Sequence, residues 1–307
     1  MIYTITLNPS IDYVMHLDKL DEGTLNRVTD VDYLPGGKGI NVSQVLAEMK
    51  LANIALGFAG DFTGQFIKES LEAKKITTDF IPVNEPTRIN VKLKTQQETE
   101  INAQGPPITE DDIQALLEKI SRFSSQDIVI LSGSIPQAST NKLYERIVRA
   151  VTEVGAQFIV DAEDDLLKQT LAYQPLMIKP NQDELSQFFK VKIKNPKDAL
   201  PYAKKLLEAG PQSVIVSFAG DGALYVSDQH IYYGRSPKGK VENSVGAGDS
   251  LVAGFVGRLT KTNHIKEAFQ YALACGSATA FSPTLAKKAD IEKLFHQVKI
   301  EDWSDQR

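Results

Sequence analysis

The sequence has very little cysteine and histidine. Cys275 is the single cysteine among 307 residues, so the chain forms no internal disulfide and no cysteine-rich metal site, and nothing requires an oxidising compartment. The four histidines have no metal-ligand spacing; they are His16, His230, His264 and His296. We therefore expect surface or core positions for them.

Long apolar runs and an excess of positive charge are also missing. No stretch approaches the roughly 18 apolar residues of a membrane span, and residues 1–7 lack the basic region and cleavage site of a signal peptide. The net charge of −5 argues against general nucleic-acid binding, which needs a basic face. We expect a cytoplasmic protein without membrane or nucleic-acid partners, in which the cations for any anionic ligand are concentrated locally.

What the chain does contain is an alternation of strand-like and helix-like segments. Apolar residues make up 42% of the sequence, and the length allows two average domains or one large α/β domain with an addition. The alternation predicts a mainly parallel, doubly wound sheet. The predicted strands are 1–7, 54–60, 128–131, 158–160, 176–178 and 214–216, and the predicted helices are 65–73, 110–123, 140–154, 197–209 and 265–281.

A second, smaller sheet is predicted from segments early in the chain. Residues 11–17 and 27–34 are strand-like on either side of a polar turn, which suggests a hairpin beside the main sheet. Residues 81–83 and 88–94 could extend the same small sheet. Arg88 would then face either a ligand cleft or solvent.

Polar and glycine-containing clusters follow four of the predicted strands, at 132–134, 161–163, 179–181 and 217–222. The carboxyl ends of parallel strands lie along one edge of a sheet, and ligands of open α/β sheets bind there. Four clusters in succession favour a ligand-binding edge over four unrelated loops.

A glycine-rich turn at 35–43 leads into the helix-like segment 42–49. It lacks the Ser or Thr after the lysine and the earlier glycine of a Walker P-loop, which excludes that motif. Its glycines allow a backbone to approach a small ligand, with Lys38 and Asn41 projecting from it. The alternative is an ordinary strand-to-helix turn with a solvated lysine.

A second small-residue turn, at 243–250, runs into an apolar segment. Gly246 and Gly248 leave room for a ligand, and the N-terminus of the following helix would offer unpaired N–H groups to a phosphate. Asp249 would place a carboxylate in the first helical turn, where it could accept a hydrogen bond from a substrate hydroxyl. The alternative is that Asp249 only caps the helix.

Three motifs in this order carry a family resemblance: GGKGIN at 36–41, KPNQDE at 179–184 and GAGDS at 246–250. Together they resemble the ribokinase-like carbohydrate kinases, the phosphofructokinase B family, over nearly the whole chain. The resemblance implies one domain over 1–307, a three-layer α/β/α sandwich with a mainly parallel sheet and a small β-sheet lid from about 11–34 and 86–104. It also implies a homodimer formed through the lid.

The resemblance further implies transfer of a phosphoryl group from ATP, with Mg²⁺, to a sugar phosphate. Fructose 1-phosphate and tagatose 6-phosphate are the two expected substrates, and a sugar-phosphate sensor without turnover is the rival from another class. Asp249 is expected to be the catalytic base, with the backbone of Gly246, Ala247 and Gly248 holding the phosphoryl group. Because the transition state of such transfers is loose, Asp249 is expected to orient the hydroxyl first and take its proton late.

Further site residues follow from the same resemblance. Those expected on the sugar-phosphate side are Asp12, Arg27, Gly37, Lys38, Asn41, Arg88 and Ser134. Those expected on the nucleotide side are Lys179, Asn181, Ser217, Gly220, Gly222 and Gly248. Asn181 and Glu184 are expected to help hold Mg²⁺, partly through water, although Glu184 by itself reads as a charge in the first turn of a helix.

Overall fold

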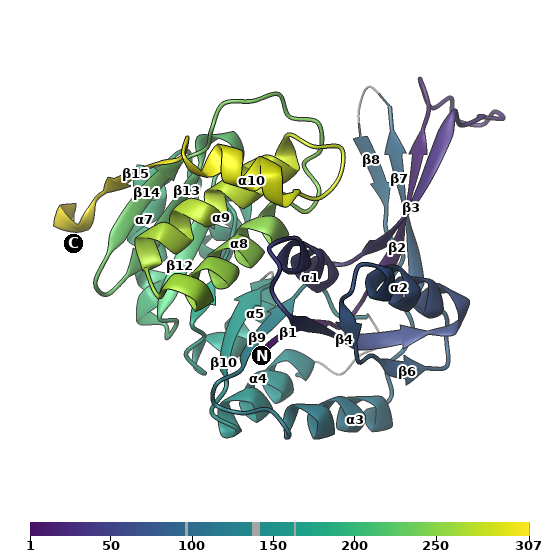
Figure 1. The fold of residues 1–307 in the computed structure, drawn as a ribbon, viewed down its shortest axis with the longest axis horizontal. Coiled ribbons are helices and arrows are strands. Elements are labelled where there is room, and N and C mark those ends of the chain that lie inside the picture. The colour runs from purple at the N-terminus through teal and green to yellow at the C-terminus, as the bar shows by residue number, and fades with distance from the viewer. Residues whose placement is uncertain (96–97, 137–141, 163, 307) are drawn as a thin grey trace.

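The computed structural model describes residues 1–95, 98–136, 142–162 and 164–306 and contains two separate sheets (Figure 1). The large sheet has eleven strands in the order β15-β14-β13-β12-β11-β10-β9-β1-β4-β5, with β6 also paired to β4. Neighbouring strands from β12 through β5 run parallel, as do β6 and β4. The remaining three strands, β13 to β15, are added antiparallel.

Where a strand of this sheet was predicted, its bounds agree closely with the predicted segment. The parallel strands are β1 (Ile2–Thr6), β4 (Asn53–Gly60), β5 (Thr77–Thr78), β6 (Ile81–Val83), β9 (Ile128–Ser132), β10 (Gln157–Asp161), β11 (Met177–Ile178) and β12 (Ser213–Ser217). The antiparallel strands are β13 (Ala223–Ser227), β14 (Ile231–Arg235) and β15 (Lys299–Asp302). β5, β14 and β15 were not predicted. β5 has two residues and β15 has a single apolar residue, Ile300, so their signals are weak, whereas β14 is a buried run of apolar residues whose signal was present in the sequence.

Helices cover both faces of the large sheet, and the alternation of strand side chains explains the two cores. In β9, Val129 and Leu131 point into one core and Ile130 into the other, as the two-residue period of a strand requires. The first core is covered by α3 (Glu110–Ile120), α4 (Leu143–Glu153), α5 (Asp164–Leu171), α6 (Gln182–Phe189) and α7 (Pro196–Glu208). The second is covered by α1 (Lys38–Glu48), α8 (Ala247–Thr262), α9 (Ile265–Ala280) and α10 (Lys288–Phe295).

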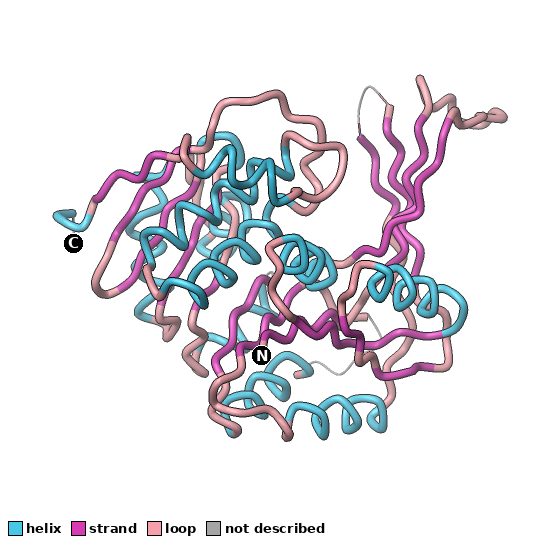
Figure 2. Tube along the Cα trace, in the orientation of Figure 1, coloured by secondary structure: helices cyan, strands magenta, loops and turns pink. Residues whose placement is uncertain are grey.

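The small sheet has four strands in the order β3-β2-β7-β8 and stands away from the large one (Figures 1 and 2). Its strands are β2 (Ser10–His16), β3 (Asp30–Gly36), β7 (Arg88–Lys94) and β8 (Glu98–Ile101). β2 and β3 form the expected antiparallel hairpin, and β7 lies parallel to β2. The helix α2 (Asp61–Ala73) packs near the base of this sheet.

Two predictions about the small sheet are wrong. Residues 81–83 form β6, which pairs with β4 of the main body rather than with the hairpin. β3 begins at Asp30, not at 27, because Asn26 closes a loop instead: its amide donates to the Asp21 carbonyl and its side-chain oxygen accepts from the Asp21 N–H, both at 2.8 Å. Arg27 consequently lies in an exposed loop.

Some helix bounds also differ. α1 begins at Lys38, four residues before the predicted helix, so the glycine turn itself forms the helix N-terminus. α3 ends at Ile120 instead of 123. Of the predicted helix 140–154, residues 140 and 141 lie outside the described part, and α4 spans Leu143–Glu153.

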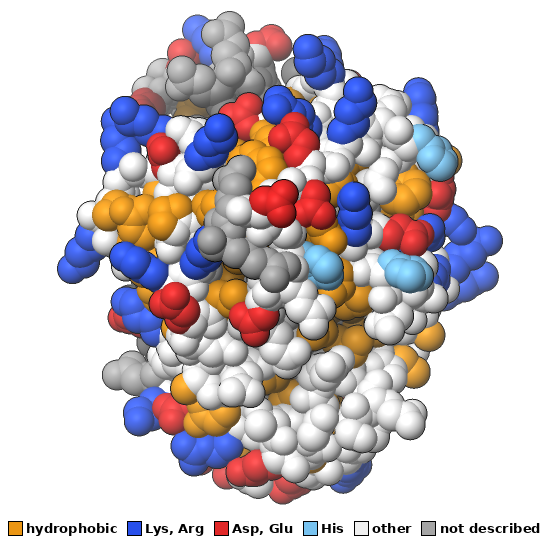
Figure 3. All heavy atoms as spheres, turned by 90° about the vertical axis from the view of Figure 1, so that its left-hand side faces the viewer, with side chains coloured by type: hydrophobic (Ala, Val, Ile, Leu, Met, Phe, Trp, Pro, Cys, Tyr) orange, Lys and Arg blue, Asp and Glu red, His pale blue; other side chains and the backbone are white. Residues whose placement is uncertain are grey.

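Acidic and basic side chains are interspersed on the surface at the β14–β15 end of the molecule, with small apolar areas between them (Figure 3). Among the helices of the described residues, none is long and apolar enough to span a membrane.

Candidate active site

Asp249 lies in the first turn of α8, as predicted. Gly246 precedes this helix with φ 78°, a left-handed conformation that favours glycine, and a Cβ atom there would lie 2.6 Å from Leu285 Cδ2. The side chain of Asp249 is buried, and its Oδ2 accepts a hydrogen bond of 2.8 Å from Asn41 Nδ2. The two glycine-rich turns, predicted separately, therefore meet at one carboxylate.

The surroundings of Asp249 raise its pKa above the ordinary value for an aspartate. Burial raises the pKa of Asp249 to about 6, and the negative charge of Asp161 adds to this rise. The ammonium groups of Lys38 and Lys179 and the hydrogen bond from Asn41 oppose the shift. A carboxylate with such a pKa is suited to accept a proton near neutral pH.

Asp161 lies between two lysines that the sequence placed in different motifs. It is at the carboxyl end of β10, its side chain is 2% exposed, and Oδ1 lies 3.4 Å from both Lys38 Nζ and Lys179 Nζ. Burial acts to raise the pKa of Asp161, but the two ammonium groups outweigh it and the pKa is lowered. Asp161 is not among the site residues predicted from the sequence; the signal that could have found it is its place in the 161–163 cluster after a strand.

Lys179 also lies against the helix N-terminus. A Cβ atom on Gly248 would be 3.2 Å from Lys179 Nζ, so glycine at this position lets the ammonium approach the backbone of α8 closely. A positive charge beside unpaired helix N–H groups suits a phosphoryl group.

Asp12 lies on β2, where the small sheet meets the glycine turn at the end of β3. Its carboxylate packs on Gly36, where a Cβ atom would lie 2.5 Å from Asp12 Cγ. Gly37 follows with φ 116° as the residue before α1. The turn thus places Asp12, Lys38 and Asn41 around one short stretch of backbone.

Arg88 and Ser134, predicted on the sugar-phosphate side, both contact Asn8. Arg88 Nη2 donates to the Asn8 carbonyl at 2.9 Å, and Asn8 Nδ2 donates to Ser134 Oγ at 3.3 Å. Burial lowers the pKa of Arg88, opposed by the charge of Asp12. The guanidinium is half-buried and also donates from Nη1 to the Ala103 carbonyl at 2.9 Å. Arg27 is not brought to this group by any contact of the described residues.

Asn181 and Glu184 form the N-terminal capping box of α6. Glu184 Oε2 accepts from the Asn181 N–H at 2.7 Å, and Asn181 Oδ1 accepts from the Glu184 N–H at 2.8 Å. Burial raises the pKa of Glu184, with the charge of Lys179 opposing the rise. Each side chain contributes oxygen chemistry of the kind that Mg²⁺ prefers. The described residues contain no cluster of three or more His, Cys, Asp or Glu side chains that would hold a metal ion alone.

The other predicted nucleotide residues follow β12. Ser217 forms a parallel bridge with Asn181, which joins the third and fourth polar clusters. A Cβ atom on Gly222 would lie 1.9 Å from the Gly234 carbonyl oxygen, so this glycine is required by the β13–β14 packing, whereas Gly220 has open space around it.

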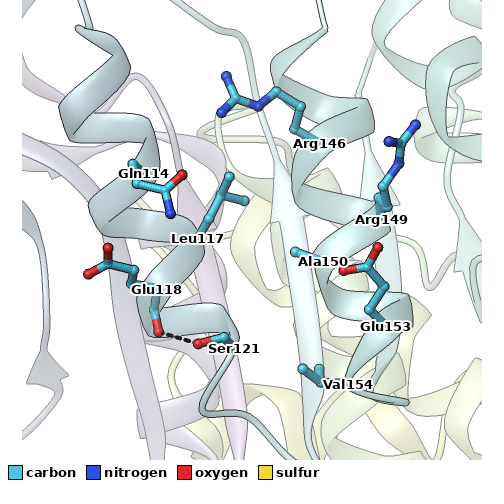
Figure 4. Close-up of a pocket in the computed structure, with 9 residues that line it drawn as sticks. All are labelled: Gln114, Leu117, Glu118, Ser121, Arg146, Arg149, Ala150, Glu153 and Val154. Carbon is cyan, nitrogen blue, oxygen red and sulfur yellow. Dashed lines mark hydrogen bonds between the residues drawn. The ribbon is translucent and has the colours of Figure 1, made fainter.

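A hollow of about 370 Å³ lies elsewhere, between α3 and α4 (Figure 4). Its lining includes Leu117, Arg146 and Arg149 but none of the predicted site residues. It is therefore separate from the group around Asp249.

The fold and this group define a class. A mainly parallel α/β sheet presents, at the carboxyl ends of its strands, a buried carboxylate in the first turn of a helix, two ammonium groups and glycine-rich backbone, which are the requirements of phosphoryl transfer to a hydroxyl. The chain belongs to the pfkB family of carbohydrate kinases, which it matches over residues 5–291.

Several curated relatives are similar over 98% of this chain and 99% of their own length. They include a 1-phosphofructokinase of Bacillus subtilis, 45% identical, a D-tagatose-1-phosphate kinase of Bacillus licheniformis, 37% identical, and a tagatose-6-phosphate kinase of Staphylococcus epidermidis, 33% identical.

A solved structure gives the same result for the fold. The crystal structure of phosphofructokinase-2 from Escherichia coli in complex with substrates and products superimposes with a TM-score of 0.92 at 27% identity, covering 96% of this chain and 98% of the other. The expected ribokinase-like architecture, a mainly parallel sheet with an additional small sheet, is confirmed.

Proposed function

We propose that this protein transfers a phosphoryl group from ATP to the C6 hydroxyl of fructose 1-phosphate, giving fructose 1,6-bisphosphate and ADP. Kinases of this family use ATP, and a 1-phosphofructokinase is 45% identical to the chain. The single observation that carries the proposal is the contact between Asn41 and Asp249, because it joins the turn expected to bind the sugar to the helix expected to bind the transferred group.

In the proposed reaction, Asp249 Oδ1 or Oδ2 accepts a hydrogen bond from the C6 hydroxyl and aligns its oxygen with the γ-phosphorus of ATP. As the new O–P bond forms and the bond to the ADP oxygen breaks, the hydroxyl proton passes to Asp249. The backbone of Gly246, Ala247 and Gly248 stabilises the charge on the phosphoryl oxygens. Lys179, held by Asp161 beside this backbone, adds a positive charge.

On the sugar side, we propose that Asp12, Gly37 and Asn41 bind hydroxyl groups. Arg88, Ser134 and Lys38 would bind the phosphate already present, because a bidentate arginine and a lysine point charge both suit that anion. The convergence of Arg88 and Ser134 on Asn8 supports this placement. Arg27 has the least support, because it lies in the exposed loop before β3.

For the nucleotide, we propose contacts from Lys179, Asn181, Ser217, Gly220 and Gly222. Asn181 and Glu184 would hold Mg²⁺ partly through water, since each keeps lone pairs beyond those used in the capping box. The ion would supply positive charge to the ATP phosphates.

We further propose a homodimer through the small sheet, which would act as a lid. Four apolar side chains form one row across its strands: Tyr33, Tyr13, Val91 and Ile101. Tyr33 is 55% exposed and Ile101 59% exposed. Exposed apolar area on a separate sheet favours pairing with a second copy.

Tagatose phosphates are the alternative substrates, because kinases for tagatose 1-phosphate and tagatose 6-phosphate are also similar to this chain. Tagatose 6-phosphate would present its existing phosphate and its free hydroxyl in exchanged positions. Selection between such sugars depends on the pairing of individual hydroxyls.

The test is ATP turnover with Mg²⁺ on fructose 1-phosphate, fructose 6-phosphate, tagatose 1-phosphate, tagatose 6-phosphate and unphosphorylated fructose, compared by kcat/KM. We expect a clear preference for fructose 1-phosphate. Preference for a tagatose phosphate would keep the mechanism and change the sugar. Binding of a sugar phosphate without turnover of any of them would replace the kinase by a sensor.

A further inference from the structure

Lys92 is a buried lysine on the inner part of the small sheet that the proposed reaction does not use. Its side chain is 9% exposed, and Nζ lies 3.4 Å from Asp12 Oδ2 and 3.3 Å from Glu100 Oε1. Burying an ammonium group is costly unless it is paired, so a lysine at this position needs a reason beyond filling space.

The register of the small sheet explains how these residues meet. Asp12 on β2 lies opposite Asn90 on β7, and Lys92, two residues further along β7, lies opposite Glu100 on β8. Side chains two residues apart in a strand share a face. One face of the sheet therefore carries this polar group, while the other carries the row from Tyr33 to Ile101.

Three neighbouring side chains, Ser10, Asn90 and Lys92, occupy most of the hydrogen-bonding capacity of the Asp12 carboxylate. Oδ1 accepts from Ser10 Oγ at 2.8 Å and from Asn90 Nδ2 at 3.3 Å, and Oδ2 faces Lys92. A carboxylate has about four lone-pair sites. Three are used within the protein, which leaves about one, on Oδ2, for a ligand.

We propose that Lys92 is a positioning residue of the sugar site: it holds the Asp12 carboxylate so that one remaining acceptor site on Oδ2 receives a single sugar hydroxyl. This inference rests on the proposed function, in which Asp12 binds the sugar. Lys92 acts through Asp12 and does not touch the reacting atoms, so its loss weakens sugar binding without slowing the chemical step to the same degree.

A purely structural ion pair is the rival explanation, and the same strand offers a matched control. Lys94 lies two residues beyond Lys92, on the same face, and pairs with Glu98 of β8. Lys94→Met removes the same charge from the same strand without touching Asp12.

The experiment is steady-state kinetics of the full-length protein with the sugar phosphate that the wild type prefers. We expect Lys92→Met to raise KM for this sugar about tenfold, the loss of roughly one charge-assisted hydrogen bond, with a much smaller change in kcat and in KM for ATP. Lys94→Met is expected to behave as the wild type. Lys92→Arg, which keeps the charge, is expected to restore part of the affinity.

A double-mutant cycle separates positioning from stability. If Lys92 acts through Asp12, the Asp12→Asn and Lys92→Met pair has about the same KM as Asp12→Asn alone. A KM in the double variant raised by the product of the two single effects would overturn the inference, as would an unchanged KM in Lys92→Met. Should the methionine variant not fold, Lys92→Gln, which keeps one donor but loses the charge, takes its place in the cycle.

Failure of the inference is distinguishable from failure of the proposed function. A wild type that turns over no sugar phosphate contradicts the function itself. A wild type that is active, together with Lys92→Met kinetics equal to those of Lys94→Met, contradicts only the role of Lys92.

Discussion

Two regions differ in how far one chain covers and pairs their side chains by itself: the site at the edge of the large sheet, and the small sheet. Around Asp249, Asp161 and Lys179 are buried with it, and each carboxylate has a partner: Asn41 donates to Asp249, and Asp161 lies between two lysines. On the small sheet, Tyr33 and Ile101 remain more than half exposed. The first region is preorganised for chemistry by its own fold, whereas the second presents apolar area that we propose a second copy covers.

The largest effect is expected when the proposed catalytic base, Asp249, is replaced, and this substitution tests the region around Asp249 most directly. Asp249→Asn should lower kcat by at least about a hundredfold, the lower range for a general base, while ATP binding is retained. Stopped-assay kinetics and ATP titration would check this. Turnover near that of the wild type would contradict the assignment.

The thermal stability of Asp249→Asn serves as the control that this variant folds. The pKa of Asp249 is raised in the folded state, so the stability that this shift contributes is present at low pH and is lost as pH rises through about 6. Asparagine carries no charge to bury. Asp249→Asn should therefore be at least as resistant to thermal unfolding as the wild type at pH 8.

The pH dependence of kcat sharpens the comparison further. With Asp249 protonated below a pKa of about 6, kcat should fall about tenfold per pH unit on the acid side. Asp161→Asn removes a negative charge that raises the pKa of Asp249, so the acid limb should move to lower pH. A limb that stays in place would show that another group titrates.

Lys38 is expected to give a moderate effect. Lys38→Ala should raise KM for the sugar phosphate roughly tenfold, the loss of one charge-assisted contact, with a smaller change in kcat. Loss of kcat at constant KM would instead place Lys38 on the transferred phosphoryl group, beside Asp161. Initial-rate measurements at saturating ATP distinguish the two.

The smallest effect on catalysis is expected from substitutions in the apolar row of the small sheet, from Tyr33 to Ile101. These substitutions test the proposed dimer interface directly. Tyr33→Asp places a charge in the proposed interface and should shift the protein toward monomers in sedimentation velocity. Phe62→Asp is the control, because Phe62 is 67% exposed on α2 rather than on the small sheet. Equal behaviour of the two variants would argue that the small sheet does not form the interface.

Much of the architecture follows from local sequence pattern. Strands such as β9 and β10 are short apolar runs bounded by polar clusters, and the order of strand and helix segments predicts the parallel sheet. The two glycine-rich turns were also visible, because glycine at positions such as Gly246 is a local requirement of the backbone. The bounds of β3 and the pairing of β6 were not, because they depend on which neighbour each strand meets.

The sequence by itself determined the parallel α/β class, the two turns and the place of Asp249 in the first turn of a helix, since each depends on residues close together in the chain. Only the tertiary structure decided that Asp161 lies between Lys38 and Lys179, and that Lys92 contacts Asp12. These contacts join residues from separate strands and turns. Their distances depend on strand order and register, and composition and spacing do not contain that information.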